Sequence, residues 1–79
     1  MNVISTTCLL CTLPSGNKAV YAVQPHHLNE IPGITLNERA ICYGEQIAVR
    51  LGDRWFKAGG REEITDLRFI ALLERCPDA

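Results

Sequence analysis

The chain has no surplus of charge of either sign and no long hydrophobic run. Eight Lys and Arg residues stand against nine Asp and Glu residues, which gives a formal net charge of −1. Indiscriminate binding to nucleic acid or to an anionic membrane surface needs an excess of cations, so this balance argues against both. No stretch approaches the roughly 18 apolar residues of a membrane-spanning helix, and the apolar run over residues 8–13 is too short for a signal-peptide core. We therefore expect a cytoplasmic protein that does not associate with membranes.

Motifs that carry catalysis are also missing. The sequence contains no phosphate-binding P-loop, no dinucleotide-binding glycine pattern and no recognisable nucleophile motif. With 79 residues, the chain is long enough for one small core but leaves little for a deep substrate pocket. We expect a single domain over residues 1–79, with residues 77–79 as a short tail, and a protein that is not an enzyme.

What the sequence does contain is a set of short strand-like segments separated by turn residues. Residues 3–13 and 18–24 are rich in Val, Ile, Thr and Tyr, and they enclose the turn sequence Pro-Ser-Gly-Asn. Proline presets the backbone of a turn, and Gly or Asn adopts positive φ at little cost. This pattern predicts an N-terminal β-hairpin.

Two Gly-acid dipeptides, Gly44-Glu45 and Gly52-Asp53, divide the following region into runs over residues 39–43, 46–51 and 54–58. Glycine at the first position of a two-residue loop favours a type II′ turn, so the runs predict a three-stranded antiparallel meander. A second interpretation stays open. Thr35 and Glu38 fit a capping box, and Gly44 fits the residue after a helix, which would make residues 36–43 helical.

The last segment, residues 62–75, has acidic residues near its start and strong helix formers near its end, as a helix favours. Its apolar residues are spread almost around the helical wheel, and their alternation also fits a buried strand. An element that is apolar on most sides usually packs under another element or a partner. The expected fold is a β-rich α+β domain: the hairpin, the meander and one C-terminal helix, whose strands could curl into a small open barrel.

The predicted meander has one face that combines aromatic and basic side chains. Pairing across the turn places Leu51 opposite Arg54 and Val49 opposite Phe56 on the core side. The candidate partner-binding residues on the other side are Arg39, Tyr43, Arg50, Trp55 and Lys57. Such surfaces stack nucleic-acid bases or hold an acidic partner. They also occur as ordinary cation–π packing, and the hairpin or the last helix could cover this face.

The favoured function is a small protein-binding module, an inhibitor or adaptor of the kind encoded by phages and mobile elements. It would dock through the aromatic and basic face or through the apolar last element. Pairing into a homodimer is compatible with its small core. The alternative is a nucleic-acid-binding regulatory domain, stabilised by zinc in one variant.

The zinc variant uses Cys8, Cys11, His26 and Cys42 as ligands, because a Cys-x-x-Cys pair begins many zinc sites. Residues three apart on a regular strand face opposite sides, however, and the second half-site is missing because Cys42 and Cys76 each stand alone. Cytoplasmic cysteines are normally reduced. We therefore expect four free thiols and no cofactor.

Overall fold

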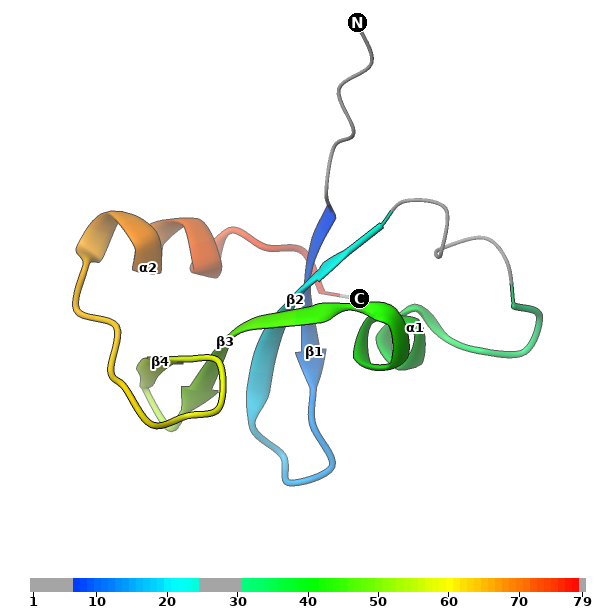
Figure 1. The fold of residues 1–79 in the computed structure, drawn as a ribbon, viewed down its shortest axis with the longest axis horizontal. Coiled ribbons are helices and arrows are strands. Elements are labelled where there is room, and N and C mark those ends of the chain that lie inside the picture. Colours follow the sequence, from blue (N-terminus) through cyan, green and yellow to red (C-terminus); the bar gives the residue numbers. More distant parts are fainter. Residues whose placement is uncertain (1–6, 25–30, 79) are drawn as a thin grey trace, which may run out of the picture.

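The structure, a computed structural model, describes residues 7–24 and 31–78 (Figure 1). These residues form one four-stranded antiparallel sheet, in the order β1-β2-β3-β4, and two helices. Along the chain the elements are β1 (Thr7–Thr12), β2 (Lys18–Val23), α1 (Leu36–Tyr43), β3 (Glu45–Leu51), β4 (Arg54–Lys57) and α2 (Leu67–Glu74). The expected β-rich α+β class is confirmed.

The first hairpin forms where the turn sequence predicts it. β1 and β2 pair antiparallel, with Thr12 opposite Lys18. In the turn, the Leu13 N–H donates to the Asn17 carbonyl oxygen at 2.7 Å. Gly16 has φ +92°, a conformation that glycine adopts without a steric penalty.

The predicted strand over residues 39–43 is wrong, because these residues belong to helix α1. Thr35 Oγ1 accepts a hydrogen bond from the Glu38 N–H at 3.2 Å, and the Thr35 N–H donates to Glu38 Oε2 at 2.8 Å. Both halves of a capping box are present, so N–H groups that have no partner within the helix are satisfied. The Gly44 N–H donates to the Ala40 carbonyl oxygen at 2.8 Å and ends the helix. The helical interpretation of residues 36–43 is the correct one.

The second hairpin keeps the predicted register. Leu51 lies opposite Arg54 and Val49 lies opposite Phe56, and Gly52 has φ +68° in the turn. The other neighbour of β3 is β2, in place of the predicted strand over residues 39–43. A register shift in the β2–β3 pairing leaves Ile47 as an extra residue in β3, which is a β-bulge.

The C-terminal helix is shorter than predicted, and the segment before it runs back along β4. The Ile64 N–H donates to the Trp55 carbonyl oxygen at 2.9 Å, so residues 62–66 are not helical. Asp66 caps α2 by accepting a hydrogen bond from the Arg68 N–H at 3.0 Å. Beyond α2, Asp78 forms a bridge to Leu10 of β1. The C-terminal segment therefore crosses the sheet from the β4 edge to the β1 edge.

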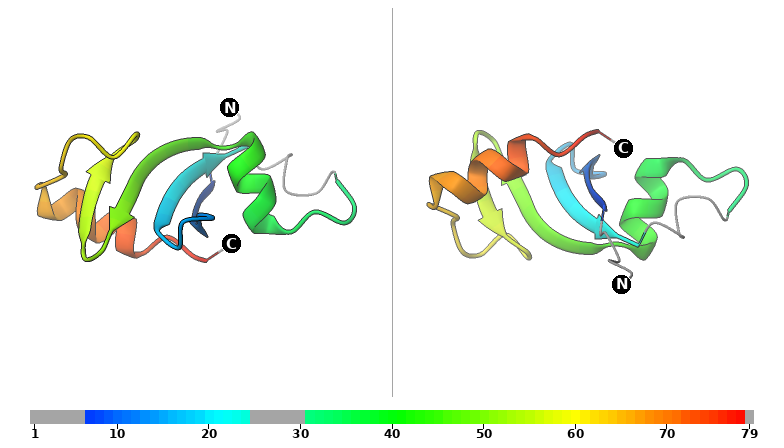
Figure 2. Two further views of the ribbon diagram at one scale, coloured as in Figure 1. Left: turned by 90° about the horizontal axis from the view of Figure 1, so that it is seen from below. Right: turned by 90° about the horizontal axis from the view of Figure 1, so that it is seen from above.

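The two helices cover opposite faces of this curved open sheet (Figure 2). The cluster on the α1 side consists of Leu9, Cys11, Ala19, Tyr21, Val23, Ala40 and Val49. The cluster on the α2 side consists of Val20, Ala48, Trp55, Ile64 and Leu73. Neighbouring strand residues enter different clusters, as the alternation of a strand requires. Neither helix in residues 7–24 and 31–78 reaches the length and apolarity that membrane crossing needs.

Candidate functional site

The five predicted partner-binding residues do not share one surface. Arg50 lies opposite Trp55, and Lys57 lies opposite Ala48, so Arg50, Trp55 and Lys57 belong to the sheet face on the α2 side. Arg39 and Tyr43 lie on α1, which packs on the opposite face. The predicted face depended on a strand at residues 39–43, and that strand is a helix.

Trp55 is a core residue. Only 4% of it is exposed, and it packs with Ile64 and Leu73 beneath α2. The expectation that Trp55 offers an aromatic surface to a partner is therefore not met in this structure. The other possibility raised by the sequence, that the last helix covers this face, is the one observed.

Arg50 and Lys57 remain at the surface around the buried tryptophan. Arg50 Nε donates to the Gly52 carbonyl oxygen at 3.1 Å, which supports the turn between β3 and β4. Lys57 Nζ forms an ion pair with Glu62 at 3.2 Å, and both side chains are exposed. Exposed pairs of this kind contribute little to stability. Both cations therefore lie beside charged and polar groups, away from any exposed aromatic ring of β4.

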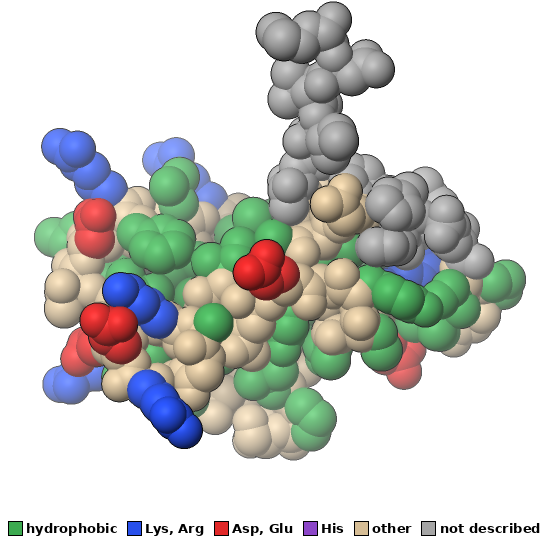
Figure 3. All heavy atoms as spheres, viewed as in Figure 1, with side chains coloured by type: hydrophobic (Ala, Val, Ile, Leu, Met, Phe, Trp, Pro, Cys, Tyr) green, Lys and Arg blue, Asp and Glu red, His purple; other side chains and the backbone are tan. Residues whose placement is uncertain are grey.

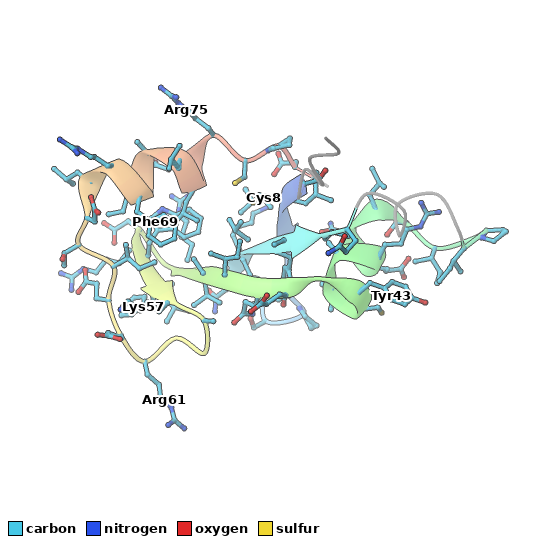
Figure 4. The ribbon with its side chains drawn as sticks, turned by 45° about the horizontal axis from the view of Figure 1, so that its top comes forward. Cys8, Tyr43, Lys57, Arg61, Phe69 and Arg75 are labelled. Atoms are coloured by element: carbon cyan, nitrogen blue, oxygen red, sulfur yellow. The ribbon has the colours of Figure 1, made fainter. Side chains whose placement is uncertain are left out.

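On α1, Arg39 has a structural contact and Tyr43 is accessible. Arg39 is half-buried, and its Nη2 donates to the Ile31 carbonyl oxygen at 2.9 Å, which ties the preceding loop to the helix. Tyr43, in the last turn, is 44% exposed and lies on the far side of the molecule from α2 (Figure 4).

A small cavity of about 150 Å³ lies between the β3–β4 hairpin and α2. Its lining residues are Arg50, Asp53, Arg54, Trp55, Glu63, Ile64, Ile70 and Glu74. The apolar members come from β4, the segment before α2 and α2 itself, and the charged members come from the β3–β4 hairpin, the same segment and α2. Two of the charged members, Arg54 and Glu63, approach each other to 3.8 Å. This cavity is open to solvent, and five of its eight lining residues are charged; it therefore resembles an enclosed apolar cavity that holds benzene in volume alone.

The outward side of α2 carries large apolar side chains that no other described element covers. Leu67 is 79% exposed and Leu72 is 61% exposed. Residues four or three apart lie on one helical row, so Leu72 lies between Arg68 and Arg75, and Ala71 follows Leu67. We call this surface the α2 outer face; it comprises Leu67, Arg68, Ala71, Leu72 and Arg75.

The α2 outer face combines these leucines with two arginines that point to solvent. Hydrophobic and cationic side chains gather over α2 at the upper left of Figure 3, and Arg75 projects away from the sheet (Figure 4). Within residues 7–24 and 31–78, neither Arg68 nor Arg75 has an ion-pair partner. The surface is therefore both apolar and positively charged.

The sequence contained one signal for this surface. The apolar residues of the last segment occupy more of the helical wheel than a single buried stripe needs. In the structure Phe69, Ile70 and Leu73 form that stripe, and the remaining leucines face solvent. What the sequence did not indicate is where the helix begins, and hence which leucines stay outside.

The residues of the zinc variant are not brought together. The Cys8 side chain packs in the cluster on the α2 side, and Cys11 is buried in the cluster on the α1 side. Cys42 is exposed on α1, and His26 lies outside the described residues. Burial raises the pKa of the Cys11 thiol, which disfavours the thiolate that binds metal. Among the residues whose positions are described, no three His, Cys, Asp or Glu side chains are grouped to hold a metal ion.

The α2 outer face and the adjoining cavity each bring apolar and charged side chains together. Ile70 and Glu74 line the cavity from α2, so the two features share this helix. Comparisons of the chain with known protein families, curated proteins and solved structures find no match.

Proposed function

We propose that the chain is a small protein-binding module, an inhibitor or adaptor, that docks through the α2 outer face. The observation that carries the proposal is the exposure of Leu67 and Leu72 on a helix whose inner side is already buried. Removing apolar surface from water is the main favourable term in protein association. Full burial of one leucine side chain contributes about 1.5–3 kcal/mol.

The charges on this face define the partner. Arg68 and Arg75 flank Leu72, so the complementary surface is an apolar groove with acidic side chains at its rim. Leu67 and Leu72 are five residues apart, which places them about 140° apart around the helix, at the two margins of the α2 outer face. An amphipathic helix that lays one face in such a groove is a recurring mode of recognition. The cavity beside Ile70 would accept one apolar side chain of the partner.

Two features favour a protein partner over nucleic acid. The α2 outer face has only two cations, and the net charge of the chain is −1. Binding to phosphate backbones draws its affinity from several cation contacts. The cytoplasmic location and the phage or mobile-element origin expected from the sequence belong to the same proposal.

A photo-crosslinking experiment tests which helix meets the partner. A photoreactive amino acid would replace Leu72 in one variant and Ile41, which is 38% exposed on α1, in a matched control. Each variant would be expressed in the source cells and irradiated. We expect a distinct protein partner joined through position 72 and absent from position 41. Crosslinking to the same proteins at both positions would contradict the proposal, as would crosslinking to a second copy or to nucleic acid.

The affinity of the purified partner then measures the contribution of the leucines. Replacing both Leu67 and Leu72 with Ser should weaken binding by about 100-fold or more, since it removes two apolar anchors of about 1.5–3 kcal/mol each and every 1.4 kcal/mol is about tenfold in affinity. The matched control replaces Leu36 and Ile41 of α1, which are 44% and 38% exposed, and should leave the affinity unchanged. Equal losses in the two double variants would rule out the α2 outer face as the docking surface.

A further inference from the structure

Two cysteines that are almost the whole chain apart in sequence meet at the edge of the sheet. The Leu10 N–H donates to the Pro77 carbonyl oxygen at 2.9 Å, and Leu10 forms a parallel bridge with Asp78. Two residues earlier along each of these parallel segments, the chain places Cys8 and Cys76. Residues two apart on a strand face the same side, so Cys8 lies on the same side of β1 as Leu10.

The side chains of these cysteines also occupy one environment. Both pack against the cluster on the α2 side, and Cys8 lies beneath the segment that follows α2 (Figure 4). The pKa of the Cys76 thiol is raised by burial, and further by the neighbouring Cys8 thiol and a side-chain hydrogen bond with it. Cys76 Sγ also contacts the Leu72 carbonyl oxygen at 3.6 Å. Both thiols are half-buried, so small reagents in solvent can reach them.

We propose that Cys8 and Cys76 form a reversible disulfide, with a low-molecular-weight disulfide such as oxidised glutathione as the oxidant. The Cys8 thiolate attacks one sulfur of the oxidant and expels a glutathione thiolate, which leaves a mixed disulfide on Cys8. Cys76 then loses its proton to solvent, attacks the Cys8 sulfur and expels the second glutathione. Two protein thiols lose two protons and two electrons, and one oxidised glutathione becomes two reduced molecules.

The disulfide would fix the C-terminal end of the docking helix. In the reduced protein, this end is held to β1 by the hydrogen bond from Leu10 to Pro77 and by side-chain packing. A covalent bond between positions 8 and 76 would close nearly the whole chain into one loop, which stabilises the folded state by restricting the unfolded one. Cytoplasmic disulfides are usually transient and redox-sensing. The proposal therefore concerns regulation of α2, and it holds whether or not the α2 outer face binds a partner.

Mass spectrometry of the purified full chain in glutathione redox buffers tests the bond directly. A variant with Cys42→Ser is the starting protein, because the exposed Cys42 would otherwise join two chains. After oxidation, and alkylation of the remaining thiol in denaturant, we expect the mass of the chain less two hydrogen atoms, plus a single alkyl group on Cys11. Digestion should give a peptide pair that joins positions 8 and 76. A disulfide at another pair, or glutathione attached to Cys8 and Cys76 without a bond between them, would overturn the proposal.

Thermal unfolding of the same samples tests the consequence. The oxidised protein should unfold at a temperature about 10 °C or more above that of the reduced protein, and dithiothreitol should reverse the shift. The shift should be absent from Cys76→Ser in the Cys42→Ser background. Cys8→Ser gives the same comparison from the β1 side and serves if the Cys76 variant does not fold. An oxidised protein that melts at or below the temperature of the reduced one would contradict the proposal.

Discussion

The two helices attach to the same sheet in different ways. α1 contacts β1, β2 and β3, and Gly44 brings the end of the helix close to β2. A Cβ atom at this position would collide with the Ala40 carbonyl oxygen, and it would lie 2.9 Å from Tyr21 Cβ and Val23 Cγ2. α1 thus fits its face of the sheet without room for one additional methyl group.

α2 is instead held by its two flanking segments and by one stripe of side chains. Residues before it pair with β4, and residues after it pair with β1. Leu73 is only 2% exposed, whereas its neighbour Leu72 is 61% exposed. The two helices therefore differ: α1 completes the core, whereas α2 also presents apolar surface to solvent.

The largest effect is expected inside the stripe of α2. Leu73→Ala should lower the free energy of unfolding by about 2–5 kcal/mol, because it leaves a cavity beside Trp55 and Ile64. The matched control is Leu72→Ala on the same helix. This variant should change the free energy of unfolding by less than about 0.5 kcal/mol. Urea unfolding followed by tryptophan fluorescence measures both. Similar losses in the two variants would mean that the outward side of α2 is packed in solution.

The next largest effect tests the close fit of α1. Gly44→Ala should lower the free energy of unfolding by about 1–3 kcal/mol, because the new methyl group meets backbone and β-carbon atoms that cannot turn away. Gly44 has φ −93°, which alanine also adopts, so backbone strain does not add to the loss. The lower entropy of the unfolded alanine variant offsets part of the contact penalty, by about 0.4–1 kcal/mol. Urea unfolding is again the measurement. A loss below about 0.5 kcal/mol would show that α1 can move outward freely, and the contrast between the helices would disappear.

The parts of the fold that were predictable depend on local chemistry. Gly16 and Gly52 take positive φ in the two hairpin turns, and the turn at Gly52 fixes the register of β3 and β4. At residues 36–43 the local signals conflicted. The Gly-acid dipeptide at Gly44 resembled a hairpin turn, while Thr35 and Glu38 specified a helix start. The capping box prevailed because its two hydrogen bonds satisfy backbone groups that a strand would have had to pair elsewhere.

The candidate site was predictable only in outline. The sequence indicated an apolar last element, but alternation placed Trp55 on an outer face without showing what lies over it. Its burial depends on Ile64, which returns along β4, and on Leu73, which reaches across the sheet. Each of these contacts joins two segments that no tight turn connects. The local sequence therefore does not specify that they pair. For the same reason, the sequence could not show that Leu72, the neighbour of Leu73, stays in solvent.

The smallest effect concerns the start of α1 and distinguishes local from tertiary stabilisation. Thr35→Ala should lower the free energy of unfolding by about 1 kcal/mol, because it removes the side chain that accepts from the Glu38 N–H. The pKa of Glu38 is lowered, first by the hydrogen bond from the Thr35 backbone and then by that from its side chain. A carboxyl group with a lowered pKa in the folded state stabilises the protein above its unfolded pKa, and this contribution is lost as pH falls through the folded pKa.

The capping contribution should therefore be present at neutral pH and fade below the ordinary glutamate pKa of about 4.3. Urea unfolding of the wild type and Glu38→Gln, at neutral pH and at about pH 3, measures the difference. The two proteins should differ most at neutral pH and converge in acid, where Glu38 carries no charge. If the difference in free energy of unfolding between the two proteins stayed constant with pH, the carboxylate charge would not act in the capping box. The capping box would then act through its hydrogen bonds without a contribution from the charge.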